Sequence, residues 1–220
     1  MRPGGCAGSV GGRREVKPLL EARQILRTMG RIVVFNSVTL DGVMQAPARP
    51  DEDLRGGFKH GGWALPYADA ISGSMAARPS ARGLLLGRRT YEDFFAVWPN
   101  RTENPFTEVL NRSQKYVASR TRREPLPWMN STLLKGEAGN TVAQLKDELD
   151  GELVVLGSGE LVQGLMQRNL VDEFVLLIHP LILGSGRRLF AEGGPAAKFR
   201  LVDTKPTTTG VIITTYERAL

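Results

Sequence analysis

Two arginines and a threonine stand at the start of a predicted helix, directly after a short apolar strand. The apolar run 84–86 forms the strand, Gly87 ends it, and the helix follows at once. The first N–H groups of a helix lack partners within the helix, and the helix dipole is positive at that end. Such a helix start binds phosphate, and neighbouring arginines add charged donors of suitable geometry. The segment therefore predicts an anion site at Gly87, Arg88, Arg89 and Thr90.

A second segment repeats this arrangement. An apolar strand at 153–156 runs into two glycines, and a helix with one apolar face follows over 159–169. Glycine lets the backbone approach a ligand closely. The third glycine of the Rossmann fingerprint is missing, so the match to that motif is weak. Two such helix starts would suit the diphosphate of a dinucleotide, and the contacts expected here are Gly157, Ser158, Gly159, Glu160 and Leu161.

A third strand, at 115–118, ends in Ser119-Arg120-Thr121. Two hydroxyls and a guanidinium at a strand end suit a phosphomonoester, and an arginine near the ribose 2′-phosphate is how NADP is distinguished from NAD. A ligand with such a phosphate, as in NADP, would suit Ser119, Arg120 and Thr121. The alternative is a polar strand exit into the basic loop 120–123.

Hydride transfer from a nicotinamide also needs a proton source near the acceptor. Asp41 follows the first predicted strand, and Asp69 lies at the start of a predicted helix. These two carboxylates are the candidate catalytic residues, although a turn-forming Asp41 and a helix-capping Asp69 are the structural alternatives. The candidate substrate-binding residues are Asn36, Ser37, His60 and Trp63, and Trp63 and Phe58 are expected to cover a planar ring by stacking.

Strands and helices alternate along the chain until residue 170, and two further strands follow. This order favours an α/β fold of three layers, with a mostly parallel mixed sheet and an antiparallel C-terminal edge. We expect one domain over residues 29–220. The predicted strands are 31–38, 83–87, 115–118, 132–135, 153–156, 173–180 and 210–217, and the predicted helices are 66–77, 90–97, 105–112, 141–149 (capped by Thr141) and 159–169.

Charge and composition limit the partners. The formal net charge is +6, but residues 1–28 contain six basic and two acidic side chains, so the remainder is nearly balanced. No basic stripe interleaved with aromatics indicates nucleic acid, and no apolar run is long enough to span a membrane. The single cysteine, Cys6, excludes an internal disulfide and fits the cytoplasm; no metal site is expected. We expect residues 1–28 to be a disordered or non-native extension.

Taken in order, these segments resemble the dihydrofolate-reductase-like family, and most closely the reductase domain of the bifunctional riboflavin-biosynthesis deaminase-reductase. The resemblance covers about residues 30 to 218. It rests on the first strand with Thr39-Leu40-Asp41-Gly42, the loop Gly56-Gly57-Phe58-Lys59-His60-Gly61-Gly62-Trp63, Gly87-Arg88-Arg89-Thr90-Tyr91-Glu92, Ser119-Arg120-Thr121, Gly157-Ser158-Gly159, and the ending from Val171 to Phe190.

The resemblance implies a dihydrofolate-reductase-like fold and an NADPH-dependent reductase of a small heterocyclic (pteridine- or pyrimidine-like) or carbonyl substrate. Its nearest model is the 5-amino-6-(5-phosphoribosylamino)uracil reductase of riboflavin biosynthesis. It also implies a homodimer, and it places Asp41 near the substrate. The zinc signature of the deaminase half is absent from the sequence, so we expect a stand-alone member. The alternative is a non-catalytic NADP(H)-binding protein of the same fold.

Overall fold

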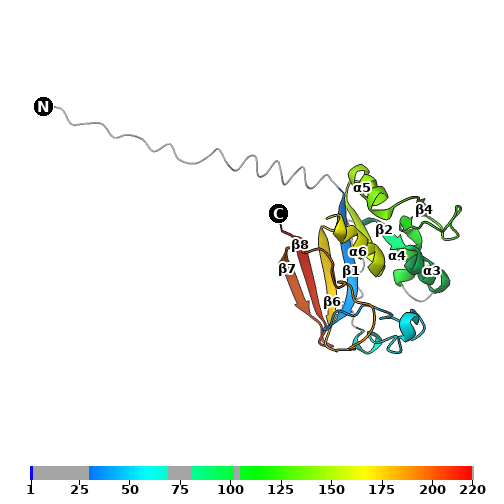
Figure 1. Cartoon of the computed structure of the whole chain (residues 1–220), viewed down its shortest axis with the longest axis horizontal. Helices are drawn as coiled ribbons and strands as arrows, with labels where there is room; N and C mark the ends of the chain where they lie inside the picture. Colours follow the sequence, from blue (N-terminus) through cyan, green and yellow to red (C-terminus); the bar gives the residue numbers. More distant parts are fainter. Residues whose placement is uncertain (2–29, 69–80, 102–104, 220) are drawn as a thin grey trace.

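The computed structural model describes residue 1 and residues 30–68, 81–101 and 105–219 of the 220-residue chain. Within these residues the chain forms one eight-stranded sheet with helices on both faces (Figure 1). The strands are β1 (Arg31–Thr39), β2 (Ala81–Gly87), β3 (Lys115–Ala118), β4 (Ser131–Leu134), β5 (Glu152–Leu156), β6 (Glu173–His179), β7 (Phe199–Pro206) and β8 (Ile212–Arg218). The helices are α3 (Arg88–Val97), α4 (Pro105–Arg112), α5 (Ala138–Glu148) and α6 (Gly159–Gln167).

The strand order across the sheet is β4-β3-β2-β5-β1-β6-β8-β7. The first six of these strands run parallel, whereas β8 pairs antiparallel with both β6 and β7. The expected α/β fold, with a mostly parallel sheet and an antiparallel C-terminal edge, is confirmed. In a parallel sheet the carboxyl ends of the strands meet at one edge, and ligands bind at that edge in open α/β sheets.

The sheet is buried on both faces because successive strand residues point to opposite sides. On one face Val34, Leu85 and Val155 pack against α5 and α6. On the other face Leu86 and Leu156 pack against residues of α3 and α4. This three-layer packing fixes where each helix begins relative to the strand that precedes it.

The structure differs from the predicted secondary structure in one additional strand and in the start of one helix. The strand β7 was not predicted, because its side chains are exposed along nearly its whole length and leave no buried-face pattern. Helix α5 starts at Ala138 rather than near Thr141, and Glu137 is its cap: the Glu137 carboxylate accepts from the Gly139 and Asn140 N–H groups. Thr141 as the cap is therefore wrong.

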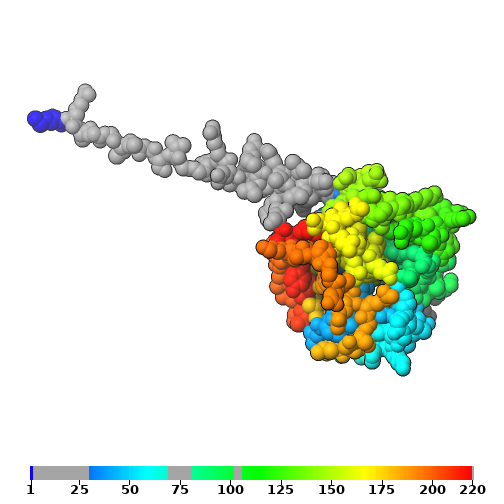
Figure 2. Space-filling model, in the orientation of Figure 1, coloured from blue at the N-terminus to red at the C-terminus, as the bar shows by residue number. Residues whose placement is uncertain are grey.

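The predicted helix 66–77 lies mostly outside the described residues. The described part holds a short 3-10 turn, Leu65–Tyr67, and another lies at Arg55–Gly57. Residues 43–68 run beside the segment that follows β6, and Figure 2 shows both at the same end of the molecule, in cyan and orange. The Met44 N–H donates to the Arg187 carbonyl at 2.9 Å, which joins the two segments. No helix in the described ranges is long and apolar enough to cross a membrane.

Candidate functional site

The three predicted phosphate-binding segments lie at one edge of the sheet. Each follows a strand of the parallel part, and β2 pairs with both β3 and β5. Gly87 lies opposite Ala118 in the ladder, so Ser119 begins directly beside the start of α3. The structure therefore brings together segments that are separated by about 30 residues or more in the sequence.

The starts of α3 and α6 are joined by two hydrogen bonds. The Gly87 N–H donates to Ser158 Oγ at 2.9 Å, and the Ser158 N–H donates to Thr90 Oγ1 at 3.1 Å. Gly157 has a φ of 57°, and a Cβ atom there would lie 3.3 Å from Thr90 Cγ2. A side chain at position 157 is therefore strained in both backbone conformation and space. Each of the two hydroxyls accepts a backbone N–H and keeps its own hydrogen to donate, so the two helix starts present adjacent hydroxyl donors.

Asn36 connects this surface to β1. Its side chain is buried, and Nδ2 donates to the Gly157 carbonyl at 3.1 Å. The amide thus holds the left-handed turn before α6 against the central strand. Ser37 is half-buried and comes next along β1, so it points to the opposite face of the strand.

Arginines from separate segments surround the start of α6. Glu160 Oε1 accepts from Arg89 Nη1 at 2.9 Å and from Arg55 Nη1 at 3.0 Å. Arg187 Nη1 lies 3.4 Å from the same oxygen. Leu161 is different, because its side chain is buried in the core and only its backbone faces the turn.

A second charge network connects α3 with the loop after β3. Glu92 pairs with Arg88 at 2.9 Å, one turn away on the same helix, and with Arg122 at 2.7 Å. Ser119 Oγ accepts from the N–H groups of Thr121 and Arg122, which orders the start of that loop. Glu92 therefore holds one arginine of α3, Arg88, and one arginine of the loop after β3, Arg122.

A basic cavity of about 720 Å³ opens beyond this loop. Lys135 at its wall pairs with Glu124 at 2.8 Å. Arg120 and Arg123 have no ion-pair partner among the residues that the structure describes. The N–H groups at the start of α5 lower the pKa of Glu137, which lines the same cavity, and the charge of Arg120 lowers it further without a direct ion pair between them. Guanidiniums at a strand exit suit a ligand with a localised double negative charge. The lining residues are Ser119, Arg120, Arg122, Arg123, Glu124, Lys135, Gly136 and Glu137.

Asp41 is held by its surroundings in a way that favours the carboxylate form. Oδ1 accepts from Thr39 Oγ1 at 2.6 Å, and Oδ2 accepts from the Gly184 N–H at 2.9 Å. The Thr39 hydroxyl, with the N–H groups of Leu183 and Gly184, lowers the pKa of Asp41 despite partial desolvation. The carboxylate thus fastens the loop after β6 to the turn after β1. Its catalytic role stays a prediction, and Asp69 lies outside the described residues.

The aromatic residues of the loop 43–68 form a small core of their own. Trp63 and Phe58 are buried with Val43 and Ala46, and Trp63 Nε1 donates to the Gln45 carbonyl at 2.7 Å. A loop of this length needs apolar contacts to hold a fixed shape, and these two rings supply them. Both rings are buried between the loop and the segment at and after the end of β6, and their stacking on a planar ring stays a prediction.

The two histidines differ in exposure. His60 is exposed and meets the Phe58 ring edge-on at 5.6 Å, so it remains accessible to a ligand. His179 is buried at the end of β6, where its ring meets Trp63 at 5.0 Å and Tyr67 at 5.6 Å. Burial lowers the pKa of His179, so its imidazole is neutral near pH 7. His179 is therefore a buried core residue.

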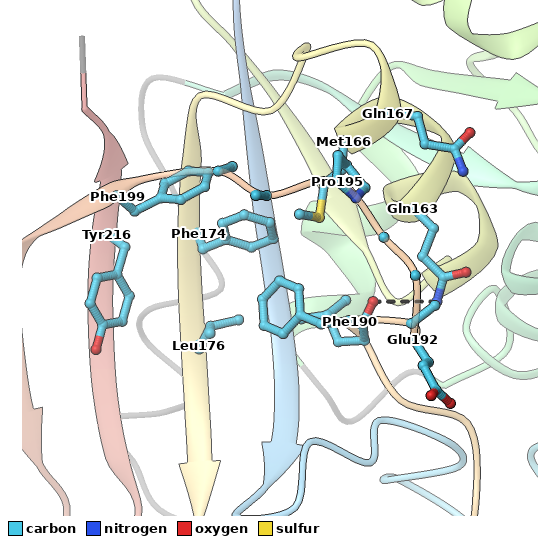
Figure 3. Close-up of a pocket in the computed structure, with 16 residues that line it drawn as sticks. Gln163, Met166, Gln167, Phe174, Leu176, Phe190, Glu192, Pro195, Phe199 and Tyr216 are labelled. Carbon is cyan, nitrogen blue, oxygen red and sulfur yellow. Dashed lines mark hydrogen bonds between the residues drawn. The ribbon is translucent and has the colours of Figure 1, made fainter.

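A separate apolar pocket of about 520 Å³ lies away from these helix starts. Figure 3 shows it between the second half of α6 and the strands β6 and β8, with Phe174, Phe190, Phe199 and Tyr216 around it. Phe174 meets the rings of Phe190 and Phe199 at 5.4 and 5.1 Å. The pocket has no arginine or lysine in its lining, so its chemistry differs from that of the phosphate-binding edge.

The three-layer sheet and the clustered strand exits define a dihydrofolate-reductase-like α/β protein. Residues 31–213 match the family model described as the RibD C-terminal domain, and the chain belongs to that family. A relative is the uncharacterized protein YwjB of Bacillus subtilis (strain 168), 36% identical over 181 residues, which cover 80% of this chain and 91% of YwjB.

Two solved structures illustrate the shared fold. A dihydrofolate reductase from Enterococcus faecalis, complexed with NADP(H), has a TM-score of 0.58 at 14% identity, covering 88% of this chain and 99% of that one. A pyrimidine reductase-like protein from Corynebacterium diphtheriae has a TM-score of 0.58 at 10% identity, covering 86% and 92%. At such identities the likeness concerns the fold alone. Membership of the family supports a reductase-like function in general.

Several residues of this edge were missed by the sequence reasoning. Glu92 had a usable signal, because it follows Arg88 by four residues on a predicted helix. The sequence contains no such signal for Arg55 or Lys135, because each reaches the site from a distant segment and has no distinctive local pattern.

Proposed function

We propose that the protein is an NADPH-dependent reductase of a small heterocyclic or carbonyl substrate. The observation that carries the proposal is the hydrogen-bonded pair of helix starts at Gly87 and Ser158, with the basic cavity at the exit of β3 beside it. The Enterococcus faecalis dihydrofolate reductase, which shares the fold, is complexed with NADP(H). We also propose a cytoplasmic location, which the single cysteine of the chain favours.

Each part of the edge has a distinct task in this proposal. The hydroxyls of Thr90 and Ser158, each of which keeps a hydrogen to donate, bind the diphosphate, with Arg88 and Arg89 adding charge. Arg120 binds the 2′-phosphate, with Ser119 and Thr121 ordering its loop. The chemistry that NADPH supplies is a hydride. The protein's contribution is to orient the two reactants and to exclude water.

The substrate side is formed by the ends of β1 and β6 with the loop 43–68. Ser37 and the exposed His60 are the polar groups offered there, together with Asn36 at the boundary with the cofactor. Asp41 shapes the adjoining turn. The family supports a substrate like that of the riboflavin-pathway reductase, a ribosylamino-pyrimidine, as the first compound to try.

Titration with NADPH and NADH, followed by cofactor fluorescence, tests the proposal. We expect saturable NADPH binding at micromolar to low millimolar concentration, with weaker NADH binding because NADH lacks the 2′-phosphate. Absence of NADPH binding at millimolar concentration would exclude the reductase. Complementation of a strain that lacks the riboflavin-pathway reductase then tests the substrate.

The alternative function, a non-catalytic NADP(H)-binding protein, predicts the same titration and a different turnover assay. NADPH oxidation, followed by loss of absorbance, should occur with at least one member of a panel of pyrimidines, pteridines and small carbonyl compounds. Binding without oxidation across the panel would favour the alternative.

We further propose that two copies pair through β7. This strand ends the sheet and exposes Leu201 and Val202 to about half of their full surface (52% and 46%). An exposed apolar edge strand is a site for pairing with another chain. Sedimentation should give twice the chain mass, and the double change Leu201→Asp and Val202→Asp should halve it. The matched control Met129→Asp alters an apolar side chain of 62% exposure elsewhere and should leave the mass unchanged. A wild-type protein at the mass of one chain contradicts the pairing.

A further inference from the structure

One carboxylate oxygen at the start of α6 receives three guanidinium groups. Glu160 Oε1 lies 2.9 Å from Arg89 Nη1, 3.0 Å from Arg55 Nη1 and 3.4 Å from Arg187 Nη1. These arginines come from α3, from the loop 43–68 and from the segment after β6. Their convergence on one atom marks a position where the protein requires negative charge.

Glu160 occupies the position that an anionic ligand would take. It lies in the first turn of α6, two residues after the left-handed Ser158, where free helix N–H groups and the dipole favour an anion. Its side chain is 60% exposed, so the carboxylate is free to turn into solvent. Arg89 and Arg187 are half-exposed, and a ligand reaches them from the same side.

The local charge balance favours a ligand that displaces the Glu160 carboxylate over a ligand that binds while the carboxylate stays in place. Asp53 also pairs with Arg55, at 2.6 Å, so three guanidiniums face two carboxylates and one positive charge remains. A diphosphate with two negative charges would leave this cluster with one negative charge while Glu160 stays in place. If Glu160 turns away, the same ligand leaves the cluster neutral.

The strengths of the contacts point the same way. Exposed ion pairs such as those of Glu160 are weak, because solvent screens both partners. A phosphate group offers several charged oxygens, and arginine binds phosphate through paired, charge-assisted hydrogen bonds. Exchange of the carboxylate for a phosphate therefore improves the contacts of the arginines.

We propose that Glu160 is an internal placeholder anion. Its carboxylate gathers Arg55, Arg89 and Arg187 in the free protein, and it gives up this place to a diphosphate group of the ligand. The proposal rests on the dinucleotide-binding function proposed above, and it reverses the expected effect of Glu160 on ligand affinity. A glutamate that touches the ligand favours binding, whereas a placeholder opposes it.

The test is titration calorimetry of Glu160→Gln with inorganic pyrophosphate and with NADPH, at one fixed salt concentration. Gln keeps the size of the side chain and removes its charge. We expect both ligands to bind about two- to fivefold more tightly, the range that one exposed ion pair supports. The control Glu192→Gln makes the same change of net charge at the apolar pocket, away from α6's start, and should leave both affinities unchanged.

Pyrophosphate separates this proposal from the reductase assignment. Tighter pyrophosphate binding by Glu160→Gln supports the placeholder even if neither protein binds NADPH, a result that would reject only the reductase. Equal, weaker or undetectable pyrophosphate binding by Glu160→Gln overturns the placeholder. A similar gain in Glu192→Gln also overturns it, because net charge alone would then explain the effect.

Discussion

Replacement of Arg120, Arg122 and Arg123 by glutamine should remove the preference for NADPH over NADH. These three side chains line the basic cavity beyond β3, and Arg120 and Arg123 have no ion-pair partner among the described residues. At about 1 kcal/mol for each exposed charged contact, NADPH affinity should fall about 100-fold or more. NADH affinity should change little, because NADH has no 2′-phosphate for these residues to bind. Parallel fluorescence titrations with the two cofactors measure both effects.

A matched triple variant controls for the loss of three positive charges. Arg82, Arg112 and Lys198 lie at other surfaces, and their replacement by glutamine lowers the net charge equally. This control should keep the wild-type ratio of the two affinities. If the cavity variant loses NADPH and NADH affinity in equal proportion, the cavity does not hold the 2′-phosphate. Single variants then rank the contributions, and Arg120→Gln should show a larger effect than Arg122→Gln, because Arg122 already pairs with Glu92.

The phosphate-binding edge was predictable where its signals are local. A strand, a glycine and a helix start are consecutive in sequence, and parallel pairing then brings all such exits to one edge. Gly87 and Ser158 were found in this way, and the structure joins them by a hydrogen bond. The hydroxyl of Thr90 was also anticipated, although its exact partner, the Ser158 N–H, was not.

The contacts between distant segments were not predictable in the same way. Arg55 meets Glu160 across 105 residues, and neither position has a periodic or spaced pattern that indicates the other. Strand β7 escaped prediction for a related reason: strand signals come from a buried face, and this strand has none. The burial of Trp63 likewise depends on how its loop packs against the end of β6, which lies more than 100 residues further along the chain.

Lys115 offers the largest expected effect on stability. It is fully buried, and its Nζ donates to the carbonyls of Leu110 and Ser113 at 2.7 Å each and of Asn111 at 3.3 Å. These carbonyls belong to the end of α4, whose last carbonyls lack partners within the helix. The ammonium also lies 4.5 Å from the centre of the Trp128 ring, a favourable cation–π contact. The Lys115 side chain thus caps the C-terminal end of α4 and packs against the core.

Lys115→Met should lower the free energy of unfolding by about 2–4 kcal/mol. Methionine matches the length of the side chain but donates to no carbonyl, so the end of α4 keeps buried, unsatisfied acceptors. Urea unfolding followed by circular dichroism measures the change. The control Lys198→Met removes an exposed lysine and should cost less than about 0.5 kcal/mol. Equal stability of the two variants would show that the bonds of Lys115 contribute nothing net.

The effect of Lys115→Met should also depend on pH. Burial lowers the pKa of Lys115 to about 8 from the ordinary value of 10.5, so between these values the unfolded chain binds more protons at this site. Stability from this group therefore rises with pH in that window and is lost as pH falls through about 8, with a slope of at most about 1.4 kcal/mol per pH unit. The stability gap between wild type and Lys115→Met should widen from pH 8 to pH 10. A gap that stays constant or narrows over this range would mean that the ammonium keeps its ordinary pKa, because the three carbonyls then offset the cost of burying its charge.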